Sequence, residues 1–167
     1  MSNLRDIRRR IKSTEQIKQI TKTMGMVASA RLRKAQLRAE QARPYAAKMK
    51  QMVENLSTNT ELPHPLFAQR EVKKIGFVVI AADRGLCGSY NTNIFLTVDK
   101  LLTKYSSDAV ELILVGRRAV NYYQLKGWTI RTQIPEWGGK MTFTDVKHLA
   151  GDLVHAFLQN QLDEIQL

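Results

Sequence analysis

Apolar residues between Leu4 and Leu56 recur mostly in steps of three and four, with irregular steps before Leu32, which places them on one face of a helix. From Leu32 onward the two steps alternate strictly, and the resulting 3.5-residue repeat predicts the seam of a left-handed coiled coil. The seam residues are Leu32, Ala35, Ala39, Ala42, Ala46, Met49, Val53 and Leu56. At about 1.5 Å per residue, the segment predicts a rod of roughly 80 Å. So narrow an apolar stripe needs a second long helix, or a surrounding protein, to cover it.

Three features modify the expected rod. Asn3 and Asp6 are spaced to cap its amino terminus, because both side chains can accept free backbone N–H groups. Gly25 costs about 1 kcal/mol inside a helix, and we favour the close approach of another surface over a merely tolerated weakness. Pro44 lacks an amide hydrogen, so it should kink the helix or begin a second one.

After a loop that contains Pro63 and Pro65, the pattern changes to short apolar runs that alternate with helical spacing. The runs have strand length and the segments between them repeat every three or four residues, which predicts an α/β domain with a mostly parallel sheet. The expected strands cover 74–82, 111–115 and 128–134, and the expected helices cover 94–105, 117–126 and 146–158. We therefore predict a helical rod over 1–58, a linker over 59–71 and an α/β domain over 72–167.

Two capping residues and the last four residues complete this prediction. Gly127 should end the helix that begins at Arg117, and either Thr142 or Thr144 should cap the next helix. Residues 164–167 have the pattern of a fourth strand that is cut short. We expect this sequence to be the amino-terminal part of a longer protein whose remainder supplies the second long helix.

The charge is concentrated on the rod. The chain has a formal charge of +11, and residues 1–56 carry 14 of its 26 Lys and Arg but only 4 of its 15 Asp and Glu. A positive rod indicates acidic surroundings, such as nucleic acid, anionic lipid or an acidic protein surface. The longest apolar run, Phe77–Ala82, is far too short to span a bilayer. One cysteine, Cys87, cannot form an internal disulfide, which suits a reducing compartment.

Several short motifs have some of the residues of a chemical site. Asp83–Gly88 follows a strand, where α/β sheets bind ligands, yet it lacks the third glycine of a dinucleotide fingerprint, so a tight turn held by Asp83 is favoured over a nucleotide site. Gly138–Lys140 lacks the residues of a phosphate loop, and we expect Trp137 and these glycines to form a mobile surface loop. We expect Cys87 to be a small packed hydrophobe.

The two histidines of the last helix, His148 and His155, are seven residues apart. They share a helix face but stand roughly 10 Å apart along it, which is too far to chelate one metal. The pattern of the sequence therefore supports neither a metal site nor a catalytic constellation.

Basic residues on several faces of the rod could bind nucleic acid, but such binding usually adds stacking or base-reading side chains. The rod has one aromatic residue, Tyr45, and an apolar seam. This combination favours a coiled coil inside an acidic protein socket over a DNA-binding arm.

The sequence resembles the gamma subunit of F-type ATP synthases. The similarity is carried by five motifs in the order in which that family has them: Leu4–Ser13, Gln19–Ala28, Arg31–Gln36, Arg43–Tyr45, and Asp83–Gly88 followed by Asn91. It covers essentially the whole chain. The carboxyl-terminal helix of that family, which pairs with the amino-terminal one, has no counterpart in these residues.

The resemblance implies a central rotor stalk that has a coiled-coil shaft and a Rossmann-like domain with flanking helices. It implies partners in the alpha and beta subunits of the catalytic head, the epsilon subunit and the c-subunit ring, and no nucleic acid. In this family, proton-driven rotation of the ring turns the shaft, which cycles the beta subunits through their conformations while ATP chemistry takes place there. The resemblance thus implies no cofactor, no metal and no catalytic residue in this chain.

By match to the family's motifs, the residues expected to contact the acidic lever segments of the beta subunits are Arg9, Arg10, Lys22, Met24 and Arg84. The expected location is peripheral, on the cytoplasmic face of a bacterial plasma membrane or the inner face of an organellar one. Two other hypotheses stay open at this point: a nucleic-acid-binding protein with a basic arm, and a nucleotide-dependent enzyme built on the α/β domain.

Overall fold

The computed structural model describes residues 4–57, 64–138 and 141–167. Its contacts divide the chain into two compact units, residues 1–62 and 63–167. The expected cap residue Asn3, the first half of the expected linker, and two residues of the glycine motif, Gly139 and Lys140, lie outside the described residues.

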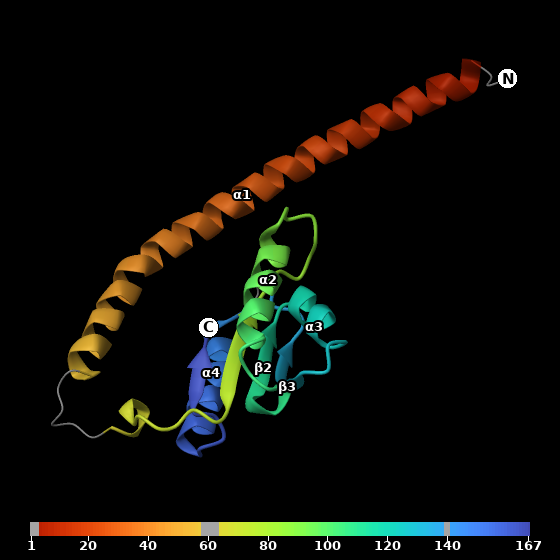
Figure 1. Cartoon of the computed structure of the whole chain (residues 1–167). Helices are drawn as coiled ribbons and strands as arrows, with labels where there is room; N and C mark the ends of the chain where they lie inside the picture. Colours follow the sequence, from red (N-terminus) through yellow and green to blue (C-terminus); the bar gives the residue numbers. More distant parts are fainter. Residues whose placement is uncertain (1–3, 58–63, 139–140) are drawn as a thin grey trace. The chain divides into compact units, whose positions relative to one another are not determined.

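The first unit is one long helix, α1, which spans Leu4–Ser57 and curves along its length (Figure 1). Its 54 residues correspond to a length of about 80 Å, as the sequence pattern predicts. The helix continues through Pro44, so a second helix does not begin there. Apart from the neighbouring backbone of α1 itself, no atom of the described residues lies within 4 Å of the position that a Cβ atom would take at Gly25, and the close approach expected there stays a prediction.

The second unit contains a four-stranded parallel sheet, which confirms the α/β prediction. The strands are β1 (Ile75–Ile80), β2 (Val110–Val115), β3 (Thr129–Ile134) and β4 (Glu164–Gln166), in the spatial order β3-β2-β1-β4. β1 pairs with β2 along its whole length, from Ile75 opposite Val110 to Ile80 opposite Val115. β4 pairs only with the first half of β1.

Three helices flank the sheet (Figure 1): α2 (Tyr90–Leu102), α3 (Arg117–Tyr123) and α4 (Phe143–Leu158). The main core lies between the sheet and α2 and α3, where Phe77 and Val79 of β1 pack with Phe95, Ala119 and Tyr123. The chain then crosses back from β3 to β4 at the opposite edge of the sheet, and this connection contains α4. Two 3₁₀ turns, η1 (Pro65–Phe67) and η2 (Ser107–Ala109), complete the unit.

Local chemistry accounts for several element ends. Thr142, and not Thr144, caps α4, because its hydroxyl accepts the Asp145 N–H while the Asp145 carboxylate accepts the Thr142 N–H in return. Gly127 has a φ of +75°, the left-handed conformation expected of a glycine after a helix. At Gly116, with φ of +96°, a Cβ atom would lie 2.1 Å from the carbonyl oxygen of Ala81. A glycine at this position therefore lets the segments that follow β1 and β2 approach each other closely.

The chain that leads into β1 is fastened to the end of α4. The guanidinium of Arg70 lies over the ring of Phe157, donates to the Phe157 carbonyl and to the Asn160 side chain, and pairs with Asp163. The Asp163 carboxylate also accepts the two backbone N–H groups of Lys73 and Lys74, directly before β1. Residues from Arg70 onward are therefore held as part of the α/β unit.

Candidate interaction surfaces

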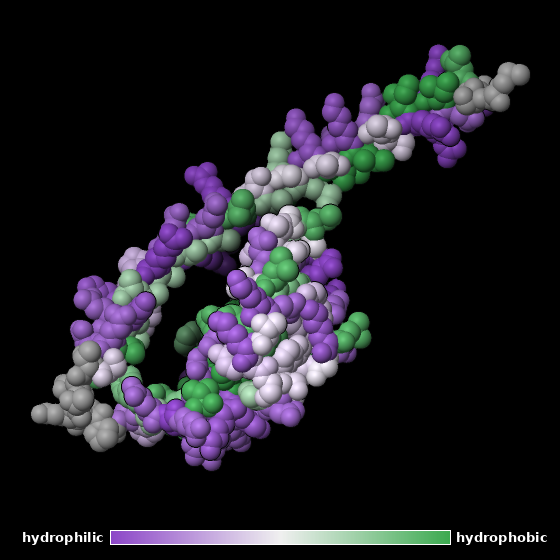
Figure 2. Space-filling model, viewed as in Figure 1, coloured by the Kyte–Doolittle hydropathy of each residue, from purple (hydrophilic) through white to green (hydrophobic). Residues whose placement is uncertain are grey.

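The surface of α1 is exposed from Leu4 to Ser57. The larger seam residues Leu32, Met49, Val53 and Leu56 leave 59%, 42%, 48% and 47% of their surfaces open. Apolar and charged residues lie side by side along the helix (Figure 2). Because helices in proteins gain most of their stability from packing an apolar face, the seam indicates a surface that another chain or segment covers.

The residues of α1 expected to contact a partner are all exposed, and Met24 leaves 66% of its surface open. Arg9, Arg10 and Lys22 project from the first half of the helix, where their charges meet solvent. The fifth candidate, Arg84, is exposed in the turn after β1 and so belongs to the α/β unit.

The turn that carries Arg84 is held at its start by Asp83. The Asp83 carboxylate accepts backbone N–H groups from Arg117 at 3.1 Å, from Trp137 at 3.2 Å, and from Gly138. Desolvation acts to raise the pKa of this carboxyl, but the three N–H donors and the nearby Arg117 guanidinium outweigh it and hold the pKa below its usual value. Asp83 is therefore an ionised acceptor that joins three segments of the chain.

The other end of the turn is held by Asn91 in the first turn of α2. Its side-chain oxygen accepts the Ala82 N–H at 3.0 Å, and its amide group lies 3.1 Å from the sulfur of Cys87. Leu86, with φ of +61°, and Gly88, with φ of +61°, make the reversal between these two anchors. The geometry is that of a tight turn, as favoured from the sequence, and it presents Arg84 and Leu86 outward.

Comparison with known proteins agrees with these features. A family model described as ATP synthase matches residues 3–167. The ATP synthase gamma chain of Protochlamydia amoebophila is 46% identical over the whole of this chain, and those of Heliobacterium modesticaldum and Brevibacillus brevis are 40% and 37% identical over 100% and 98% of it.

The chain belongs to the ATP synthase gamma chain family. The matches cover 59%, 57% and 58% of those three relatives, so the chain spans a little over half of their length. The resemblance found in the sequence motifs is confirmed. Among the described residues, no helix is both long enough and apolar enough to cross a membrane.

Two expectations about the turn and its neighbour were wrong. Cys87 is not packed but exposed on the turn. Trp137 lies in the loop after β3 but not at the surface: it is partly buried, its backbone N–H donates to Asp83, and its indole Nε1–H donates to the Ala81 carbonyl at 3.3 Å. A sequence signal existed for this contact, since Asp83 and Trp137 both follow strands of one parallel sheet and must lie at the same edge.

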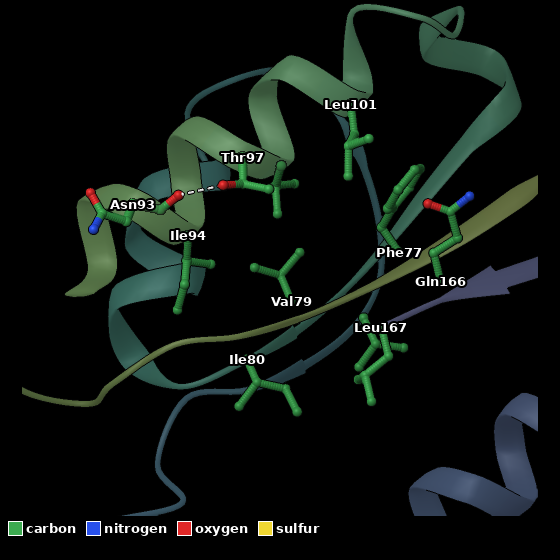
Figure 3. A pocket seen from close by; sticks show the side chains of 11 residues that line it. Phe77, Val79, Ile80, Asn93, Ile94, Thr97, Leu101, Gln166 and Leu167 are labelled. Atoms are coloured by element: carbon green, nitrogen blue, oxygen red, sulfur yellow. Dashed lines mark hydrogen bonds between the residues drawn. The ribbon is translucent and has the colours of Figure 1, made fainter. Parts of the chain in front are cut away.

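The remaining candidates add no chemical site. His148 and His155 are exposed on α4, and the described parts of the chain contain no group of three or more His, Cys, Asp or Glu that could hold a metal ion. A groove of about 430 Å³ lies between α2 and β1, beside the end of β4 (Figure 3). Its walls are apolar side chains with the amides of Asn93 and Gln166 and the hydroxyl of Thr97, so it offers no titratable group among the described residues.

Proposed function

We propose that this chain is part of the central rotor stalk of an F-type ATP synthase, with α1 as one strand of the shaft. The observation that supports this most directly is the 54-residue helix whose apolar seam remains exposed from end to end in a member of the gamma chain family. The shaft couples proton-driven rotation of the membrane ring to the conformational cycle of the catalytic subunits, which is a mechanical population shift.

The partners in this proposal are the alpha and beta subunits, the epsilon subunit and the ring of c subunits. Arg9, Arg10, Lys22, Met24 and Arg84 contact acidic lever segments of the beta subunits. The concentration of 14 basic residues in residues 1–56 supports an acidic socket. The exposed seam favours protein over nucleic acid, because phosphate contacts do not require an apolar stripe.

The chain contributes coupling and no catalytic group in this proposal, because ATP chemistry takes place in the beta subunits. Its association with the membrane is peripheral and indirect, through the c ring. Stiffness is then the property on which function depends, and a continuous helix through Pro44 supports that role.

The proposal is tested by reversing two charges on the shaft in the assembled enzyme. Arg9→Glu with Arg10→Glu places acidic groups against the acidic levers, so ATP-driven proton pumping should fall by a factor of about two to five per lost contact. The matched control is Arg33→Glu with Lys34→Glu, which makes the same charge change at another adjacent exposed pair of α1. Equal pumping by the two double variants would refute the assignment of Arg9 and Arg10.

A further inference from the structure

Three segments that are distant in the sequence meet at the carboxylate of Asp83. Asp83 itself lies in the turn after β1. The first residue of α3 contributes the Arg117 N–H, and the loop after β3 contributes the N–H groups of Trp137 and Gly138. Each contact is a hydrogen bond from a neutral donor to an ionised acceptor, which is stronger than a bond between neutral groups. The carboxylate thus ties the loop after β3 to the turn that carries Arg84.

The loop after β3 approaches Asp83 so closely that it leaves little space for rearrangement. Gly138 has φ of +29°, and a Cβ atom there would lie 3.2 Å from the Asp83 Oδ2 atom. The indole of Trp137 reaches past the carboxylate to the Ala81 carbonyl. The guanidinium of Arg117 pairs with Glu136, the neighbour of Trp137, so a side-chain ion pair also links the first residue of α3 to the loop after β3.

We propose that Asp83 is a positioning residue, whose carboxylate clamps the loop after β3 to the turn after β1 and so presents Arg84 outward from a fixed base. The functional half of this inference rests on the proposed contact between Arg84 and a partner subunit. The structural half does not. Arg84 itself is exposed, so its direction depends on how firmly the turn beneath it is held.

The clamp is tested by amide hydrogen exchange on the full-length subunit. Asp83→Asn keeps the size of the side chain but replaces one acceptor oxygen with a donor, so it cannot accept on both sides. The amides of Trp137, Gly138 and Arg117 should then exchange roughly ten to a hundred times faster, the effect of losing a hydrogen bond to a charged acceptor.

Asp108→Asn is the matched control, because it removes the same charge from an exposed aspartate in η2. Exchange at Trp137 that is equal in the two variants would overturn the clamp. If Asp83→Asn does not fold, Asp83→Glu serves instead: it keeps the charge but moves the oxygens by one methylene, and unchanged exchange at Trp137 and Arg117 would overturn the clamp equally.

The positioning role is tested by a double-mutant cycle in the assembled enzyme, with the ratio of proton pumping to ATP hydrolysis as the readout. Asp83→Asn should lower this ratio at least about twofold when Arg84 is present, and should lower it no further in an Arg84→Gln background. A loss of equal size in both backgrounds would show that Asp83 does not act through Arg84. An unchanged ratio in Arg84→Gln alone would refute the proposed Arg84 contact, whereas the exchange experiment still decides the clamp.

Discussion

Ala46 and Ala47 provide the most direct test of a two-stranded shaft. They are adjacent, chemically identical and both exposed on α1, but only Ala46 belongs to the seam. An aspartate at either position loses the same helix propensity, about 0.7 kcal/mol or less relative to alanine. Either aspartate also lies three or four residues from Arg43 and Lys50, so the local electrostatic interactions nearly cancel between the two variants.

What remains is the cost of burying a carboxylate, which applies only where a partner helix covers α1. An effective penalty of several kcal/mol is expected for a carboxylate without a cationic partner in such a contact. A difference of about 3 kcal/mol corresponds to a factor of more than one hundred in an equilibrium constant. Ala46→Asp should therefore reduce assembly of the full-length subunit into the enzyme by about that factor, while Ala47→Asp should assemble nearly as the wild type does.

The assay is the amount of the subunit retained in the purified enzyme, together with the thermal midpoint of the assembled particle. Circular dichroism of the free subunits should show equal helix content in the two variants, since helix propensity and the local charge interactions nearly match between them. If Ala46→Asp and Ala47→Asp assemble equally well, the seam is not covered by another helix and the shaft proposal fails.

Two further predictions concern the α/β unit. Gly76→Ala should lower the free energy of unfolding by about 1–3 kcal/mol in chemical denaturation, because the new Cβ atom would lie 2.8 Å from Leu162. Leu162→Ala should then cost less stability in the Gly76→Ala background than in the wild type, and additive effects of the two substitutions would contradict this contact. The Asp99 carboxylate accepts from Tyr122, Tyr123 and Lys126; burial acts to raise the pKa of Asp99, but these hydrogen bonds outweigh it, so the pKa is lowered. The stabilisation by the Asp99 carboxylate is therefore fully present above about pH 4–5 and is lost as the pH falls through the lowered pKa. Asp99→Asn should flatten the acid side of a plot of thermal midpoint against pH, and an unchanged slope would refute this role of Asp99.

Much of the architecture could be predicted because periodicity reports local structure directly. The continuous apolar runs of β1 and β2 and the three-to-four spacing of α1, α2 and α4 identified those elements within a few residues. The boundaries were less exact where tertiary contacts decide them. The expected helix from 117 to 126 ends at Tyr123, and Tyr105 lies beyond α2 yet still packs against the ring of Phe77.

The candidate site was predictable only in part. The Asp83 turn followed from its glycines and from its place after a strand, but the role of Trp137 was missed and Cys87 was expected to be a small packed hydrophobe. Both errors concern packing between elements: Trp137 meets a carboxylate 54 residues earlier in the chain, and Cys87 is exposed on its turn. Neither fact changes the local hydrophobic pattern from which those expectations were made.

The sequence by itself therefore determined the long basic helix, its seam and the alternation of strands and helices, because each depends on the spacing of neighbouring residues. The tertiary structure alone decided the strand order β3-β2-β1-β4 and the meeting of three segments at Asp83. These depend on which distant groups come within hydrogen-bonding or packing distance, and that distance is set only when the sheet has formed.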